Sequence, residues 1–290
     1  MKKNIFVLFM VLALVCLSIA AYAAEPEKAA DLSNWKEKIA EEIAAVPFDV
    51  GAYVLNVADN EVFEHNADKR FSSASIIKLF VLNELFNQAK KGEVKLSDTI
   101  IFDHSIAVEG GMLHKFSSGA TLRLEDLALL MLSVSCNTAT NILIDHLGMD
   151  KINASIQAMG AKETVLGRKM LDFEARKAGR DNFTTAGETG KLLAAFLKED
   201  PRVLDMVSLQ KDRGKLAGKL GFDDNDDLEP ILANKTGELP GFYHDAGVFF
   251  YAAPRPVVVV VMTGNVPHLN VGCDFIGRIG KIVYDAFLVE

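Results

Sequence analysis

The sequence has 290 residues, of which 50% are hydrophobic and 24% are charged, and its formal net charge at pH 7 is −8. This length and composition are enough for a sizeable core in one large domain or in two interleaved ones. The acidic balance argues against nucleic acid or an anionic membrane as a partner, because both attract basic surfaces.

The chain begins with the pattern of a secretory signal peptide. Lys2 and Lys3 form a positive region, residues 5–20 are apolar, and residues 21–23 (Ala-Tyr-Ala) offer a small-residue cleavage site. A retained membrane anchor is the alternative, but the apolar run is short for a span. We therefore expect residues 1–23 to be removed, leaving a mature chain of net charge −10 in the periplasm with no membrane span.

Hydrophobic periodicity predicts the elements of the mature chain in order. Apolar residues recur at helical spacing from Trp35, whereas residues 49–55 and 61–65 alternate around a turn and predict a β-hairpin. The predicted helices span residues 32–45, 75–88, 122–134, 138–147, 149–159, 185–197 and 275–287. The predicted strands span residues 49–55, 61–65, 230–235, 245–252 and 257–263.

Strands therefore lie at both ends of the chain and helices fill the middle. The fold class that follows is α/β (α+β), with an antiparallel sheet made from both chain ends, flanking helices and an all-helical insertion. Five consecutive valines at 257–261 predict a strand buried on both faces. We expect residues 24–71 and 206–290 to form the α/β part and residues 72–205 the helical part.

The first candidate catalytic pair is Ser75 and Lys78. A three-residue spacing at the start of an apolar helix places both side chains on one face, one turn apart. The helix dipole favours a developing negative charge at that serine. Lys78 can act as its base if burial and a neighbouring cation lower the lysine pKa. A helix cap followed by a solvated lysine is the alternative interpretation.

A second motif, Ser135-Cys136-Asn137, follows this pair along the chain. The Ser135 hydroxyl can relay a proton to a leaving nitrogen, and Asn137 can hold a substrate amide. Cys136 could itself be a thiol nucleophile, although its apolar context favours a buried core cysteine. We expect Cys136 and Cys273 to be free thiols, while a disulfide between them stays open.

The third motif is Lys235-Thr236-Gly237. Lys235 supplies positive charge for a substrate carboxylate, Thr236 can hydrogen-bond that carboxylate, and Gly237 lets a ligand approach the strand edge. The backbone amides of Ser75 and Glu238 would then form an oxyanion hole. Together the three motifs contain the parts that acyl transfer requires.

These motifs, in this order and separated by 60 and 100 residues, resemble the penicillin-recognising serine hydrolases, and class A β-lactamases most of all. The resemblance extends over residues 32–288. It implies a β-lactamase/transpeptidase-like fold and a cofactor-free, metal-free, monomeric hydrolase. By resemblance, the substrate is a β-lactam or a peptidoglycan peptide, and the reaction passes through an acyl-enzyme.

Two positions depart from the class A pattern. Cys136 stands where the family has an aspartate. Class A β-lactamases also carry a water-activating glutamate on a loop whose ends are pinned by an ion pair. Arg168 and Asp181 resemble this ion pair, and Met170 stands at the position of that glutamate. Glu174 falls where the family has an asparagine, so it is either a displaced base or a bystander on a charged loop.

His244 lies where class A enzymes often have an arginine for the substrate carboxylate, and a packed histidine at a strand end is the alternative. The resemblance over the whole chain favours a β-lactamase. The missing glutamate favours a D,D-carboxypeptidase or another penicillin-binding protein. A β-lactam receptor without turnover is the remaining hypothesis. Whether Lys78 or a carboxylate takes the first proton also stays open.

Overall fold

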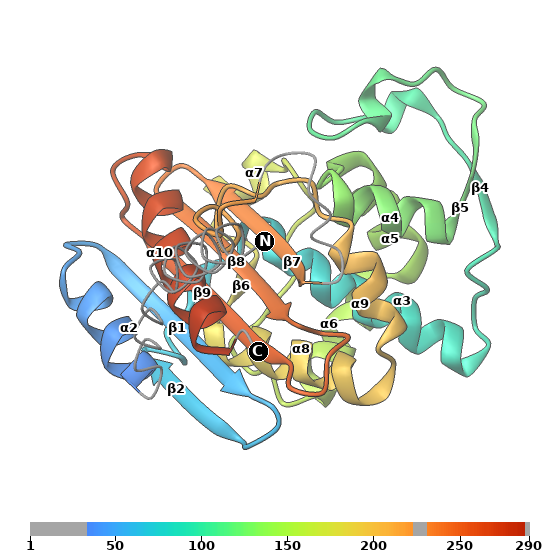
Figure 1. Cartoon of the computed structure of the whole chain (residues 1–290). Coiled ribbons are helices and arrows are strands. Elements are labelled where there is room, and N and C mark those ends of the chain that lie inside the picture. The colour runs from blue at the N-terminus through green and yellow to red at the C-terminus, as the bar shows by residue number, and fades with distance from the viewer. Residues whose placement is uncertain (1–33, 223–230, 288–290) are drawn as a thin grey trace, which may run out of the picture. The chain divides into compact units, whose positions relative to one another are not determined.

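The computed structural model describes residues 34–222 and 231–287, and the expected signal peptide lies outside these ranges. Its main feature is a five-stranded sheet in the order β2-β1-β9-β8-β7, and every neighbouring pair is antiparallel. The sheet strands are β1 (Asp49–Asn56), β2 (Glu61–His65), β7 (Leu232–Leu239), β8 (Phe242–Phe249) and β9 (Val257–Gly264). Both ends of the chain therefore contribute to the sheet, as expected (Figure 1).

Helices fill the sequence between the two groups of strands. The helices are α2 (Trp35–Ala44), α3 (Lys78–Lys91), α4 (Leu124–Ser133), α5 (Asn137–Leu147), α6 (Met149–Ala158), α7 (Phe173–Lys177), α8 (Ala186–Glu199), α9 (Arg202–Ser208) and α10 (Leu269–Phe287). Short 3-10 turns are η2 (Ala74–Ile77), η3 (His104–Ile106) and η4 (Leu113–Lys115), and the small ladders pair β3 (Phe71–Ser72) with β6 (Phe183–Thr184) and β4 (Thr99–Ile101) with β5 (Thr121–Arg123).

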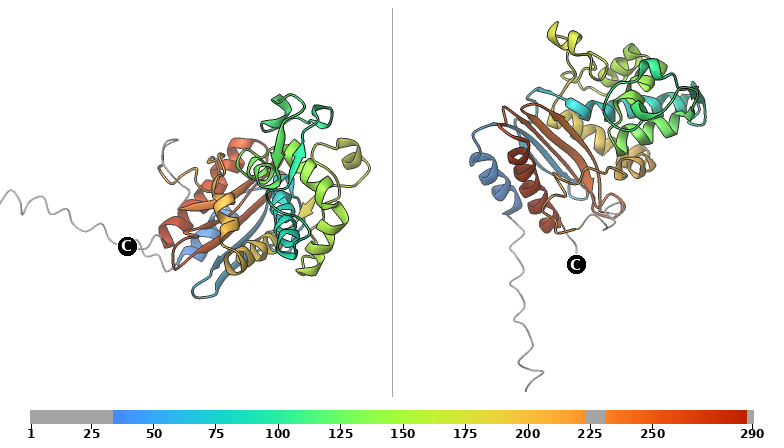
Figure 2. Two further views of the ribbon diagram at one scale, coloured as in Figure 1. Left: turned by 90° about the vertical axis from the view of Figure 1, so that its right-hand side faces the viewer. Right: turned by 90° about the horizontal axis from the view of Figure 1, so that it is seen from above.

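The valine run in β9 explains the layering. Val258 and Val260 point into a core shared with the central helices, whereas Val257, Val259 and Val261 point into a core shared with α2 and α10. Because successive strand residues face opposite sides, a strand covered on both faces needs a continuous apolar run. Figure 2 shows α2 and α10 on one face of the sheet and the other helices beyond the opposite face.

Several predicted boundaries shift in the structure. The strand expected from residue 245 begins at Phe242, because Pro240 and Gly241 form a tight turn that lets β8 pair with β7 along its whole length. The helix expected from Ser75 starts as the 3-10 turn η2 and becomes α-helical at Lys78. The small ladders were not predicted, because two- or three-residue strands carry no periodic signal.

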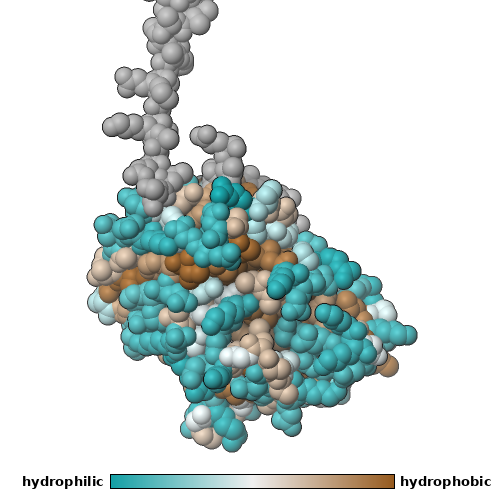
Figure 3. Space-filling view, turned by 90° about the horizontal axis from the view of Figure 1, so that it is seen from below, coloured by the Kyte–Doolittle hydropathy of each residue, from teal (hydrophilic) through white to brown (hydrophobic). Residues whose placement is uncertain are grey.

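Polar side chains cover most of the face seen in Figure 3, with an apolar band across it. Among the described residues, no helix is both long and apolar enough to cross a membrane. Residues 35–287 all belong to one compact unit, so the division into an α/β part and a helical part stays a prediction.

Candidate active site

The candidate nucleophile lies at the junction of η2 and α3. Ser75 is half-buried, between residues that are fully or almost fully buried. Ala74, directly before it, has a φ of +47°, a left-handed conformation that costs an alanine about 1 kcal/mol. Such local strain persists where the surroundings fix the backbone, and it is frequent at functional sites. The N–H of Ser75 lies in the first turn of η2, where amides lack intrahelical acceptors.

Lys78 joins the first motif to the second. Its Nζ donates to the carbonyl oxygen of Ser135 at 2.7 Å, to Ser135 Oγ at 3.0 Å and to Asn137 Oδ1 at 2.9 Å. The side chain is fully buried. Burial and then the charge of Lys235 hold the Lys78 pKa well below its usual value. The solvated-lysine interpretation of Lys78 is therefore wrong, and both conditions expected for a lysine base are present.

The third motif lies on β7, at the edge of the sheet. The charge of Lys235 is close enough to lower the pKa of Lys78. Burial lowers the pKa of Lys235 itself to about 8. Gly237 faces η2, where an added Cβ would lie 3.2 Å from the carbonyl oxygen of Ser73 and 3.0 Å from a side-chain carbon of Ile76. A larger side chain at position 237 would therefore press against the segment that holds the candidate nucleophile.

The second motif is held in place by the segment between β4 and β5. Asn137 donates from its backbone N–H to the carbonyl of Gly110 at 3.2 Å and from its side chain to Glu109 O at 3.0 Å. Gly111, with a φ of +81°, packs so closely on Cys136 that a Cβ at position 111 would overlap it. Ser135 also adopts a positive φ, of +52°. The backbone around the motif is therefore fixed without the aspartate that the family usually places at residue 136.

Cys136 is fully buried in the main core cluster, which matches the core alternative rather than a thiol nucleophile. Cys136 is a free thiol, as is the half-buried Cys273. The two described cysteines thus do not form the disulfide that the sequence left open.

His244, expected either to contact the substrate carboxylate or to pack at a strand end, lies in the interior of the protein. Its side chain is fully buried. Because Nδ1 accepts the N–H of Thr263 at 3.1 Å, the ring proton belongs on Nε2, which lies 2.9 Å from Ser72 O and donates to it. Burial lowers the pKa of His244 to about 4, which keeps the ring neutral. The packed alternative is therefore correct, and His244 instead holds the strand that leads to Ser75.

The loop that carries the expected deacylation residues is pinned at its ends. Arg168 Nε donates to Asp181 Oδ1 at 2.7 Å, and both side chains are nearly buried. Asp181 also accepts a hydrogen bond from Ser72 Oγ at 2.6 Å. The expected ion pair is confirmed, and it connects the loop to the segment before the nucleophile.

The inner part of this loop presents Met170. Its backbone N–H donates to Asn141 Oδ1 at 2.7 Å, and its carbonyl accepts from Asn141 Nδ2 at 3.1 Å. The Met170 side chain is 6% exposed and belongs to the main core cluster. Asn141 lies on α5, the helix that starts with the second motif, so the loop is held against the site at a residue that has no ionisable group.

Glu174, the alternative base, lies at the surface. Its side chain is 83% exposed, and its carboxylate accepts from Lys177 Nζ at 2.7 Å within α7. A carboxylate that lies in solvent and is paired with a surface lysine has no fixed position from which to activate a water molecule. The charged-loop interpretation therefore describes the position of Glu174.

Sequence reasoning missed a second ionic cluster beside β7. Lys215 Nζ contacts Asp212 Oδ2 at 2.6 Å and Glu238 Oε1 at 2.5 Å. Nearby, burial raises the pKa of Asp245 to about 7, and this carboxyl accepts from Asn234 Nδ2 at 2.9 Å. The signals were weak, because Lys215 lies 17 residues before Leu232, the first residue of β7, and belongs to no motif.

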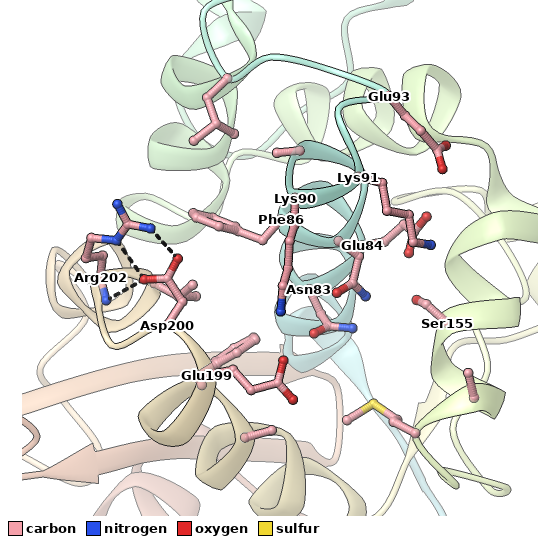
Figure 4. A pocket seen from close by; sticks show the side chains of 18 of the residues that line it. Asn83, Glu84, Phe86, Lys90, Lys91, Glu93, Ser155, Glu199, Asp200 and Arg202 are labelled. Atoms are coloured by element: carbon pink, nitrogen blue, oxygen red, sulfur yellow. Dashed lines mark hydrogen bonds and ion pairs between the residues drawn. The ribbon is translucent and has the colours of Figure 1, made fainter.

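A broad groove of about 1560 Å³ opens elsewhere, between α3, α6, α8 and α9. Figure 4 shows its mixed charges, including the ion pair of Asp200 with Arg202. Its lining contains none of the three motifs. In the part of the chain that the structure describes, no group of three or more His, Cys, Asp or Glu side chains could hold a metal ion.

Comparison with known proteins agrees with this geometry. The model of the beta-lactamase enzyme family matches residues 34–287. Beta-lactamase PSE-4 from Pseudomonas aeruginosa is 27% identical over 151 residues, and this alignment spans about half of each chain. Beta-lactamase CTX-M-8 from Citrobacter amalonaticus is 26% identical over 82% of this chain and 84% of its own.

Solved structures give the same result. A beta-lactamase from Sphaerobacter thermophilus is 29% identical, with a TM-score of 0.77 over 90% of this chain and 99% of its own. A PBP-A variant, solved as an acyl-enzyme complex with penicillin G, is 25% identical with a TM-score of 0.74 over 89% and 97% of the two chains. The predicted mixed fold is confirmed, and this chain belongs to the beta-lactamase enzyme family.

Proposed function

We propose that this protein is a serine hydrolase that opens β-lactams through an acyl-enzyme on Ser75. The observation that carries the proposal is the buried Lys78 ammonium, which bonds Ser135 Oγ at 3.0 Å and Asn137 Oδ1 at 2.9 Å while the charge of Lys235 lowers its pKa. The lowered pKa favours loss of a proton from this ammonium, and the resulting amine is a proton acceptor next to a hydroxyl relay.

The proposed acylation begins when the neutral amine of Lys78 takes the proton of Ser75. The freed Oγ attacks the β-lactam carbonyl, and the backbone N–H groups of Ser75 and Glu238 stabilise the oxyanion. When the intermediate collapses, the carbon–nitrogen bond breaks and the ring nitrogen receives a proton from Lys78 through the Ser135 hydroxyl. The product of this step is an ester on Ser75, which water then hydrolyses.

Substrate binding is assigned to the other motif residues. Asn137 would hold the substrate amide, and Lys235 and Thr236 would receive its carboxylate. Gly237 would leave room for the substrate along β7, because a glycine has no Cβ and an added Cβ would lie against η2.

A second candidate is a D,D-carboxypeptidase or another penicillin-binding protein that acts on peptidoglycan peptides. Met170 favours it, because Asn141 fixes a buried apolar residue where class A enzymes carry their water-activating glutamate. Both candidates share the acylation step and differ in how fast the ester breaks down. A receptor without turnover would differ only in never releasing the acyl group.

Mass spectrometry of the full chain with benzylpenicillin separates these candidates. A transient adduct with accumulating product supports the β-lactamase, and a persistent adduct supports a penicillin-binding protein or receptor. Release of D-alanine from an acyl-D-alanyl-D-alanine peptide would then identify the peptidase. The Ser75→Ala variant serves as the control, and an adduct that survives this substitution would contradict the assignment of the nucleophile.

We also infer that the mature protein is a monomer of the periplasm, reached by cleavage after residue 23. The positive and apolar segments at the start of the sequence support the export step. Cell fractionation with and without residues 2–23 tests it, and cytoplasmic retention of the full sequence would contradict it.

A further inference from the structure

The ionic cluster beside β7 contains one buried cation and two carboxylates. Lys215 is 1% exposed, whereas the side chains of Asp212 and Glu238 are 36% and 45% exposed. Burial alone would lower the pKa of Lys215, but the two carboxylates outweigh it and raise that pKa. Lys215 is therefore a permanent positive charge whose partners reach solvent.

This cluster adjoins the hydroxyl that we assign to the substrate carboxylate. Asp212 hydrogen-bonds the Thr236 side chain, and Gln210 Nε2 lies 3.5 Å from the same hydroxyl oxygen. Glu238 is two residues further along β7, and its carboxylate lies 2.5 Å from Lys215 Nζ. A carboxylate bound at Thr236 would thus enter next to Lys215, where two carboxylates already surround one ammonium.

We propose that Glu238 occupies, in the free protein, the place at Lys215 that a substrate carboxylate takes, and that Glu238 thereby disfavours anionic substrates. This inference rests on the proposed function. Of the two partners, Glu238 is the more exposed and lies at the edge strand, so it can turn into solvent when a substrate binds. Asp212 stays with Lys215, because its Oδ2 lies 2.6 Å from Lys215 Nζ and its Oδ1 also accepts from the backbone N–H of Gly214 at 3.0 Å.

Charge balance gives the reason for the selectivity. Lys215, Asp212 and Glu238 sum to a net charge of −1, so a substrate carboxylate adds a further negative charge to this cluster unless Glu238 leaves, while Lys235 attracts it. Like charges at such distances repel most strongly where solvent is partly excluded. A neutral substrate meets no such repulsion and gains nothing from Lys215. Glu238 is therefore a specificity-determining side chain, whereas Lys215 is a second cation, besides Lys235, that an anionic substrate can reach.

The test compares benzylpenicillin with its methyl ester in the full chain. The rate constant of acylation is measured for each by mass spectrometry, and the ratio of acid to ester is taken for each variant. Glu238→Gln should raise this ratio about fivefold, the effect of removing one partly exposed charge. Lys215→Met should lower the ratio by at least as much, because the cation is lost.

Glu61→Gln is the matched control. Glu61 is also 45% exposed and paired with a lysine, Lys36, but it lies on β2 at the far edge of the sheet. A ratio that stays the same in Glu238→Gln, or that moves equally in Glu61→Gln, would overturn the inference. If neither compound acylates the unaltered protein, the proposed function itself fails, and the two failures are thus distinguishable.

Discussion

The attacking side of the site, around Ser75 and Lys78, and the loop beside it differ in whether they carry the ionisable groups that the proposed reaction needs. On the attacking side, Lys78 makes three hydrogen bonds and lies next to a second buried lysine, Lys235. The loop over residues 164–184 is anchored as firmly, by Arg168 and Asp181, but it presents Met170. In the proposed mechanism, forming the acyl-enzyme and breaking it down thus depend on separate structural units, which can change independently.

The largest expected effect comes from removing the proposed base. Lys78→Met should slow acylation by benzylpenicillin about 10²–10⁴-fold, the usual contribution of general-base catalysis, while the fold persists because methionine fills a similar volume. Adduct formation is followed by mass spectrometry, and circular dichroism checks the fold. Lys151→Met, at an exposed ion pair, is the control. Acylation at an unaltered rate would remove Lys78 from the mechanism.

A glutamate at position 170 should supply the ionisable group that the loop lacks. Met170→Glu is expected to shorten the lifetime of the acyl-enzyme about 100-fold, since burial raises the pKa of a carboxylate toward that of a useful base. The lifetime is measured by the loss of the adduct after excess penicillin is removed. Met170→Gln, which places a neutral side chain of similar size there, should leave the lifetime long. Equal lifetimes in the two variants would show that the loop does not control deacylation.

Acid should destabilise the folded protein through protonation of His244. Its pKa of about 4 in the folded state lies below the unfolded value near 6.5, so its contribution is complete above pH 6.5 and is lost as the pH falls toward 4. The free energy of unfolding should decrease by about 3 kcal/mol from this group between pH 7 and pH 4. Urea unfolding at the two pH values measures it.

His244→Asn serves as the reference for that measurement, because it removes the titrating ring while other groups continue to titrate. The loss on acidification should be smaller in this variant than in the unaltered protein. Equal losses would mean that the neutral ring between Ser72 and Thr263 does not resist protonation.

The smallest effect is expected at Glu174. Because its carboxylate is exposed and paired with Lys177, Glu174→Gln should change the hydrolysis rate by less than about twofold. Steady-state hydrolysis of a chromogenic β-lactam gives the rate. A tenfold or larger decrease would restore Glu174 as a base and remove the contrast between the two sides of the site.

Motif order and periodicity were enough to predict most of the fold. The valines of β9 fixed a strand buried on both faces, and the alternation around β1 and β2 fixed the hairpin. The start of β8 was misplaced because Tyr243 and His244 continue a strand whose turn is made by Pro240 and Gly241. Local patterns could not show that pairing with β7 extends to the turn.

The sequence by itself determined which residue types the site contains, because three short motifs in a fixed order carry the candidate nucleophile, the proposed relay and the proposed carboxylate contacts. Only the tertiary structure decided which side chains of the site and its surroundings are charged and which are exposed to solvent. Burial and partners distant in the sequence make His244 neutral, place Glu174 in solvent and surround Lys215 with carboxylates. Protonation and access depend on neighbours brought together by folding, such as Ser72 and His244, and no spacing along the chain encodes them.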